Sequence, residues 1–295
     1  MSKSSKASDP VFKVAKKRVK KLLKAVARER SEASAAETAP ALSPKLVHKL
    51  RVTSKRLRAL LQLYRPVASK KAVKTVEQAV KALAKSYSGQ RDALVQYQTL
   101  GQLVEEYRAG EDRDLQPLLC YFAEHLEAHQ RDTRTPMAPT PALEEILDLW
   151  QQQLPGKQAP DCQEGMEFTY SRARKLAFEA ESRDDDELYH QCRKWTKYYL
   201  YQAQMLVKKP RPKDKALIDD LKQLGVLLGD FHDRCVLEQN LNQLLRSEQP
   251  DEALEQATLL MLSWLMERKR QDKEACHRCF ETLFTSPRSP LQLSH

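Results

Sequence analysis

Glycine is scarce in this chain, with seven residues among 295, and long stretches contain neither glycine nor proline. Few tight turns are therefore possible, which favours long helices. No stretch alternates apolar and polar residues for long enough to predict a strand. No apolar run approaches the roughly eighteen residues of a membrane-spanning helix, and the first ten residues lack the apolar segment of a secretory signal. We expect an all-α, cytoplasmic protein without a membrane partner.

Signatures of catalysis and of metal binding are also missing. The sequence has no P-loop, no nucleophile elbow and no H-E-x-x-H. Cys276 and Cys279 form one C-x-x-C, but the second pair that a tetrahedral zinc site needs is not present. The six cysteines are expected to be reduced. The sequence therefore predicts neither an enzyme nor a bound metal or cofactor.

Acidic residues are nearly missing from the first quarter of the chain. The net charge is +10, but residues 1–76 contain 21 Lys and Arg against four acids, while the remainder contains 29 against 36. Ten basic residues and no acid lie between Ser43 and Val76. A solvated helix face normally mixes both signs in i,i+4 pairs. A bound polyanion explains this bias better than solvation does.

Periodicity and helix-breaking residues predict two helical halves, about 10–132 and 163–285, joined by a proline-rich linker over 133–162. Residues 1–9 are predicted to be a disordered basic N-terminus, and residues 286–295 a disordered tail. The expected helices cover about 10–30, 44–64, 68–108 with a break near Ser88–Gly89, 112–132, a short piece at 142–154, 164–182, 186–208, 213–246 with a break near Gly229, and 251–284.

One basic motif occurs twice, roughly 140 residues apart, which indicates an internal repeat. A short signature ending in Asp follows each copy a little over forty residues downstream. The two motifs are His48-x-x-Arg51-x-x-x-Lys55, followed by Arg91-Asp92, and His190-x-x-Arg193-x-x-x-Lys197, followed by His232-Asp233.

Helical spacing places the basic residues of each motif on one face and the leucines of the first motif on the other. Arg, Lys and His together suit phosphate, because Arg offers a planar fork of donors, Lys a mobile charge and His a donor that can gain a proton. The predicted stripes are His48, Arg51, Lys55 and Arg58; His190, Arg193, Lys197 and Lys208, with Lys194 at the edge; and Lys13, Lys17, Lys20 and Lys24.

In these motifs the sequence resembles the CHAD family, the conserved-histidine α-helical domain, over about residues 10–285. The resemblance rests on VHKLRVTSKRLRALLQLYRP, YHQCRKWTKYYLYQAQML, SGQRDALV, LGVLLGDFHDRCVL and YSRARKLAFEAE. It implies two pseudo-symmetric four-helix-bundle repeats around a basic groove or pore, and binding of inorganic polyphosphate, in some cases at polyphosphate granules. It adds Lys194 to the ligands and, more weakly, Arg174. Leu200 stands where the first repeat has Arg58, so the second stripe is expected to be shorter.

Two other functions remain open from the sequence. The basic first 76 residues could bind nucleic acid, although no aromatic residue for base stacking is interleaved in the first basic stripe. The His232-Asp233 pair could ligate a metal in a phosphohydrolase, but Asp233 could equally hold a nearby cation or cap a helix. Polyphosphate binding without catalysis is the preferred hypothesis.

Overall fold

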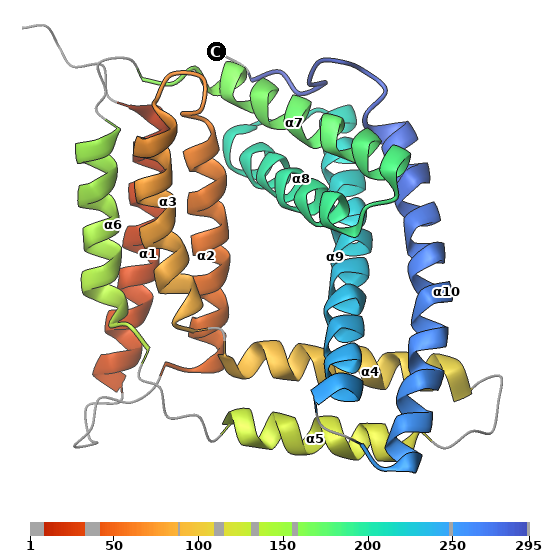
Figure 1. Cartoon of the computed structure of the whole chain (residues 1–295). Coiled ribbons are helices and arrows are strands. Elements are labelled where there is room, and N and C mark those ends of the chain that lie inside the picture. The colour runs from red at the N-terminus through yellow and green to blue at the C-terminus, as the bar shows by residue number, and fades with distance from the viewer. Residues whose placement is uncertain are drawn as a thin grey trace, which may run out of the picture.

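The described residues of this computed structural model form ten helices and no strand, which confirms the all-α prediction (Figure 1). The structure describes residues 9–32, 42–87, 89–108, 115–130, 136–154, 159–247 and 250–293. The helices are α1 Pro10–Glu32, α2 Pro44–Gln62, α3 Lys70–Lys85, α4 Gly89–Arg108, α5 Gln116–Gln130, α6 Pro139–Gln153, α7 Cys162–Arg183, α8 Asp186–Leu206, α9 Pro212–Ser247 and α10 Glu252–Leu283.

Side-chain caps fix where several of these helices begin. Asp9 accepts the backbone N–H groups of Val11 and Phe12, and thereby caps α1. Serine or aspartate does the same for five other helices, and each cap satisfies a backbone donor that the helix leaves without a partner. Those caps are Ser43 for α2, Ser69 for α3, Asp161 for α7, Asp185 for α8 and Asp251 for α10. Residues 1–8 of the predicted N-terminal tail lie outside the described residues, and Asp9, which the prediction included in that tail, caps α1.

The helices pack as three groups of four. The N-terminal bundle contains α1, α2, α3 and α6, and the C-terminal bundle contains α7, α8, α9 and α10 (Figure 1). The third group, the base, is made by α4 and α5 against the far ends of α9 and α10. With 36 residues, α9 is about 54 Å long at 1.5 Å per residue, which lets one helix serve two groups. Contact between α2 and α8 joins the two bundles.

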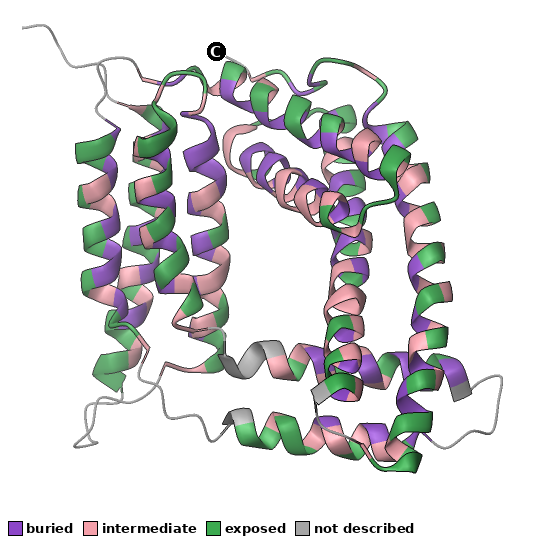
Figure 2. Cartoon of the chain, viewed as in Figure 1, coloured by how far each residue is buried: buried purple, intermediate pink, exposed green. Residues whose placement is uncertain are grey.

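Buried faces follow this division (Figure 2). One continuous apolar core runs through both bundles, and a second, smaller core fills the base around Leu103, Leu241 and Met261. The hydroxyl of Tyr64 donates to Asp9 and accepts from Nε1 of Trp150 at 3.1 Å. These contacts tie the ends of α1 and α2 to α6.

The predicted linker over 133–162 is wrong in one respect, because most of it is α6, a full member of the N-terminal bundle. Leu143, Ile146 and Trp150 are at most 1% exposed and pack in the main core. The prolines around this segment mark its ends rather than a break between domains. A fourth helix must cover the apolar sides of α1 and α3, and α6 is the helix that does so.

The predicted break near Gly229 is also wrong, since α9 continues through it. The break near Ser88–Gly89 is confirmed, because α3 ends at Lys85 and α4 begins at Gly89; Ser88 itself lies outside the described residues. A single glycine inside a helix costs only about 1 kcal/mol, which packing on both sides of α9 offsets. In the first half of the chain, α3 therefore ends and α4 turns into the base. In the second half, α9 continues into the base without a break.

The predicted disorder of residues 286–295 is wrong as far as residue 293. Leu291 is fully buried, and the hydroxyl groups of Ser289 and Tyr199 are hydrogen-bonded at 2.7 Å. The backbone N–H of Leu293 donates to the side chain of Gln163. This segment covers apolar surface of α7 and α8 and so belongs to the core. Over the described part of the chain, no helix is both long and apolar enough to cross a membrane.

Candidate functional site

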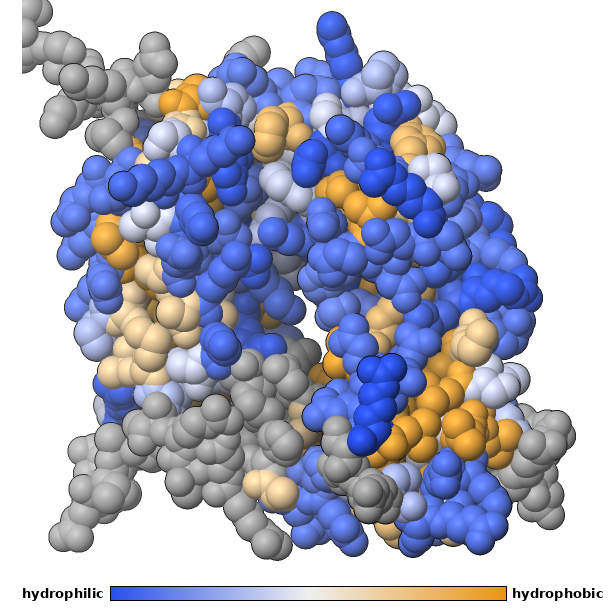
Figure 3. All heavy atoms as spheres, in the orientation of Figure 1, coloured by the Kyte–Doolittle hydropathy of each residue, from blue (hydrophilic) through white to orange (hydrophobic). Residues whose placement is uncertain are grey.

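The two predicted basic stripes lie on α2 and α8, beside a hollow at the centre of the molecule. In the space-filling view this hollow separates the N-terminal bundle from α9 and α10, and hydrophilic residues border it (Figure 3). Helix α8 packs against α2 on one side and α9 on the other. We call the surface formed by the basic residues of α2 and α8, together with the facing part of α9, the central groove.

On α2 the stripe is partly exposed and partly fastened to α3. His48 and Lys55 are exposed, and Arg51 and Arg58 are half-buried. Nη1 of Arg51 donates to the carbonyl oxygen of Tyr87 at 3.1 Å, just beyond the C-terminus of α3. The leucines at 46, 50, 57 and 61 are buried, as their spacing predicts. The basic side chains of α2 therefore project from the bundle, and its core holds the helix that carries them.

The buried carboxylate of Glu77, on α3, holds Arg58 at the C-terminal end of this stripe. Glu77 is 5% exposed and accepts hydrogen bonds from Nε of Arg58 and the hydroxyl of Tyr198, both at 3.3 Å. Lys81 at 3.4 Å and Arg65 at 3.9 Å complete its ion pairs. The cluster holds more positive than negative charge, so it keeps a net attraction for an anion.

The pKa values of this cluster reflect the same excess. Burial alone would raise the pKa of Glu77, but Lys81, Arg58 and Lys194 outweigh it and hold that pKa below its usual range. Burial lowers the pKa of Lys194, and Lys81 and Arg58 lower it further against the opposing effect of Glu77. Side chains of α2 and α3 in the N-terminal bundle and of α8 in the C-terminal bundle thus interact with the Glu77 carboxylate. This shared contact fixes the position of α8 against α2.

We expect Glu77→Gln to lower the free energy of unfolding at pH 7 by about 1–3 kcal/mol, since it removes the negative charge that pairs with several partly buried cations. A carboxylate with a depressed pKa stabilises the fold above its unfolded pKa and loses this effect as pH falls through the folded value. The difference from wild type should therefore shrink toward pH 3. Urea unfolding at both pH values measures it.

The exposed Glu145 on α6 provides the control for this substitution. Glu145→Gln should change the stability by less than about 0.5 kcal/mol at either pH. Equal effects of the two substitutions would show that Glu77 does not organise the cluster.

On α8 the stripe turns toward α9. Nδ1 of His190 and Nδ1 of His232 are 3.0 Å apart, within hydrogen-bond distance. A Cβ atom at Gly225 would lie 2.8 Å from Nζ of Lys197, and one at Gly229 would lie 3.7 Å from Nε of Arg193. Glycine at 225 therefore leaves the space that the Lys197 side chain occupies between the two helices. The basic residues of α8 are packed into a crevice rather than spread on an open surface.

Burial, and then the neighbouring cations, disfavour positive charge in this crevice. Burial lowers the pKa of His232 to about 4, helped by Arg193 and His190. Burial and then Arg193 lower the pKa of Lys197, with Asp230 as the opposing acid. The pKa of His190 is also below its usual value, because burial, Arg193 and Lys194 outweigh Glu187. Each shift disfavours the positively charged form, so an incoming anion would relieve the repulsion.

One donor in the crevice has nothing to bind. Within the described part of the chain, Nε of Arg193 is buried and has no hydrogen-bond partner. A buried N–H without an acceptor costs about 1–3 kcal/mol, and such groups usually find a partner in protein, water or ligand. The Nε–H group of Arg193 can therefore donate to a further hydrogen-bond partner in the crevice.

Several predicted residues lie elsewhere. Lys208 is outside α8, which ends at Leu206, so the prediction that it shares the face of His190 is wrong. Arg174 donates through Nε to the carbonyl oxygen of Phe284 at 2.8 Å and lies over the Phe178 ring, and it fastens the end of α10. The side chains of Arg91 and Asp92 are outside the described residues. Lys13, Lys17, Lys20 and Lys24 are exposed together on α1.

Some residues of the groove were not predicted from the sequence. Glu77 and Lys81 are an i,i+4 pair on α3, and tertiary packing brings Arg65 and the α8 residue Tyr198 to the same carboxylate. The expected metal-ligating role of His232 was an alternative, whereas its observed partner is His190. The described residues contain no group of three or more side chains that could hold a metal ion. One sequence signal indicated this part of the groove: His232-Asp233 follows the second motif at a distance similar to that of Arg91-Asp92 after the first.

The chain belongs to the CHAD domain family, whose model matches residues 24–242. Two solved structures share its fold over nearly the whole length. PptA from Streptomyces chartreusis is 13% identical, covers 94% of this chain and 98% of its own, and has a TM-score of 0.65. The CHAD domain from the plant Ricinus communis is 18% identical, covers 94% and 93%, and has a TM-score of 0.61. No match is found among curated proteins.

Proposed function

We propose that this protein binds inorganic polyphosphate in the central groove without chemically altering it. The observation that carries the proposal is the crevice of Arg193, Lys197, His190 and His232, where burial and mutual repulsion disfavour positive charge and a buried donor has no partner among the described residues. A chain of phosphates supplies closely spaced negative charges and acceptors. The chain belongs to the CHAD family. Its resemblance to that family implies polyphosphate as the ligand, which supports the proposal.

Within this proposal the residues have distinct roles. Arg193 and Lys197 bind phosphate from the α8 side, and His48, Arg51 and Lys55 from the α2 side. Arg58 and Lys194 contribute positive charge while Glu77 positions Arg58. Each charge-assisted hydrogen bond contributes about 1.5–3 kcal/mol, so a few of them suffice for tight binding. Binding at polyphosphate granules in the cytoplasm would be a direct use of such a site.

Nucleic acid is the second candidate, because the first 76 residues contain 21 Lys and Arg against four acids. Recognition of single strands commonly uses aromatic rings on which bases stack. The groove tyrosines are already covered: the guanidinium of Arg58 lies 5.6 Å from the Tyr198 ring centre, and that of Arg56 lies 6.0 Å from the Tyr201 ring centre. The covered rings favour polyphosphate over nucleic acid.

Competition at fixed salt separates these candidates. We expect unlabelled polyphosphate to displace a labelled polyphosphate chain at much lower phosphate concentration than DNA or RNA does. By analogy with DNA, affinity should fall roughly a hundredfold or more between about 50 and 200 mM salt, because each neutralised phosphate releases condensed counterions. A salt-independent affinity, or equal displacement by RNA, would contradict the proposal. Release of phosphate in the presence of divalent metal would show an enzyme instead.

A further inference from the structure

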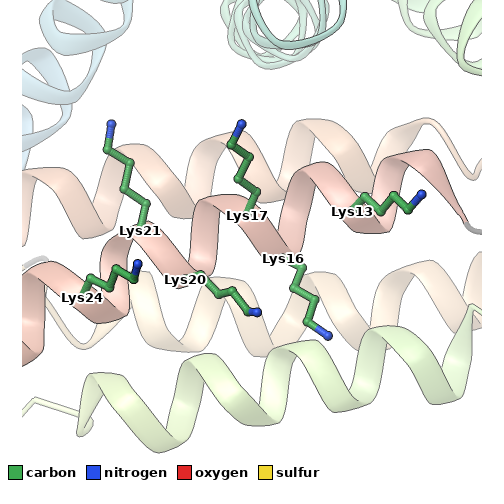
Figure 4. Close-up of a pocket in the computed structure, with 6 residues that line it drawn as sticks. All are labelled: Lys13, Lys16, Lys17, Lys20, Lys21 and Lys24. Atoms are coloured by element: carbon green, nitrogen blue, oxygen red, sulfur yellow. The ribbon is translucent and has the colours of Figure 1, made fainter.

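A second basic surface lies on α1, outside the central groove. Six lysines line an open pocket of about 490 Å³ along this helix, and all of them are exposed (Figure 4). Among the described residues, none of the six forms an ion pair with a carboxylate. They are Lys13, Lys16, Lys17, Lys20, Lys21 and Lys24, and we call them the α1 lysine surface.

This arrangement carries an electrostatic cost in the absence of a ligand. The opposite face of α1 is buried in the core through Val11, Val19 and Val26, so the helix cannot rotate to separate the lysines. Lys13, Lys17 and Lys21 follow one another at i,i+4 spacing, at which like charges destabilise a helix. A multivalent anion along α1 would reverse the sign of these interactions.

The α1 lysine surface is connected to the central groove by two arginines. Burial lowers the pKa of Arg18 on α1, and the positive charge of Arg56 on α2 lowers it further. Arg56 in turn lies over the ring of Tyr201 on α8, and Tyr201 is also within electrostatic reach of Arg193. Positive charge therefore continues from α1 through α2 to the groove crevice.

Arg56 shares one feature with Arg193, which is also found at Arg234 and Arg268. In the part of the chain that the structure describes, its Nε is buried and has no hydrogen-bond partner. Arg56 lies over the Tyr201 ring, and Arg193 acts on Tyr201 electrostatically. In the close-up, Lys17 and Lys21 point away from α6, on the side where α8 and α9 lie (Figure 4). Arg56 is on α2, which packs against α1 on one side and against α8 on the other.

We propose that the α1 lysine surface and Arg56 extend the groove into one continuous anion path, so that long polyphosphate chains bind more tightly than short ones. This inference rests on the proposed function. From Lys13 to Lys24 the surface adds about 16 Å of path at 1.5 Å per residue. A long chain held in the groove presents its remaining phosphates to α1 at high effective concentration, whereas a short chain occupies the groove alone.

The test compares tripolyphosphate with long-chain polyphosphate on the full-length protein. The variant Lys17→Gln, Lys21→Gln, Lys24→Gln removes three charges from exposed positions and keeps residues that favour helix. We expect its affinity for the long chain, per mole of chain, to fall tenfold or more. Its affinity for tripolyphosphate should change less than threefold.

A matched control removes three charges from the exposed face of α7, through Arg172→Gln, Lys175→Gln, Arg183→Gln. The control should alter both affinities less than threefold, since charges beyond about 10 Å are screened at ordinary salt. If the α1 variant loses no more long-chain affinity than the control, the inference is wrong and the groove proposal stands. Loss of anionic-vesicle binding without loss of long-chain affinity would assign the surface to membranes and overturn the inference. If the wild type binds neither chain, the proposed function fails first.

Discussion

Replacing Arg193 by Gln together with Lys197 by Met should lower polyphosphate affinity by roughly a hundredfold or more. Each residue contributes a charge-assisted contact of about 1.5–3 kcal/mol, and every 1.4 kcal/mol is about tenfold in affinity. Arg193 also supplies the buried Nε that lacks a partner among the described residues. Titration of labelled polyphosphate at fixed salt measures the loss.

The same double variant should leave the fold at least as stable as wild type. The lowered pKa of Lys197 means that its charged form is less favourable in the folded protein than in the unfolded chain. At neutral pH the charge therefore opposes folding, and its removal relieves repulsion with Arg193. Met keeps most of the apolar stem that fills the space at Gly225.

Lys213 and Lys215, exposed near the start of α9, provide the charge-matched control. Their replacement by Gln should change the affinity less than threefold, because exposed charges outside the site are screened. A double variant of Arg193 and Lys197 that melts at clearly lower temperature but binds normally would show that these cations are structural. In that case the groove would not be the binding site.

Polyphosphate affinity should rise as pH falls from neutral toward about 5, by up to about tenfold per pH unit for each proton taken up. In the empty protein His190 and His232 have lowered pKa values, the latter about 4, so both are uncharged at pH 7. A bound polyanion favours the imidazolium form and raises these pKa values. Binding must then take up protons between the free and the bound values.

The measurement is calorimetry in buffers of different ionisation enthalpy, combined with affinities from pH 5 to 8. His190→Gln with His232→Gln should flatten the pH dependence and keep most of the affinity at pH 7.5, where Arg and Lys carry the charge. His125→Gln, at an exposed position on α5 in the base, is the comparison variant and should leave the pH dependence unchanged. Equal proton uptake by wild type and by the double histidine variant would show that the pair does not contact the anion.

The stability of the fold at low pH provides a second test of the His190–His232 pair. Histidines whose pKa is lowered in the folded state destabilise the fold as pH falls below the unfolded value of about 6.5. The ligand-free protein should therefore lose stability between about pH 6.5 and 4, and the double histidine variant should lose less. Polyphosphate should protect the wild type over this range, because it favours the protonated pair.

Local patterns in the sequence were sufficient to find the helices that carry the groove. Apolar spacing at 3.6 residues places Leu50 and Leu57 in the core, and the same periodicity puts Arg51 and Lys55 on the other side of α2. The repeat of the motif identified α8 in the same way. These features depend on neighbours within one or two helical turns, which is why a sequence without a structure can show them.

Tertiary packing determined which of these cations lie close together and in which direction their pKa values shift. Arg58 meets Glu77, nineteen positions away on another helix, and His190 meets His232 across the α8–α9 interface. The same applies to α6, which entered the N-terminal bundle because an apolar face of α1 and α3 needed cover, and to Gly225, which leaves space for Lys197. The sequence by itself determined the helical class, the basic stripes and the family resemblance. Only the fold determined burial, and burial sets the pKa shifts and the orphan donors on which the proposed binding depends.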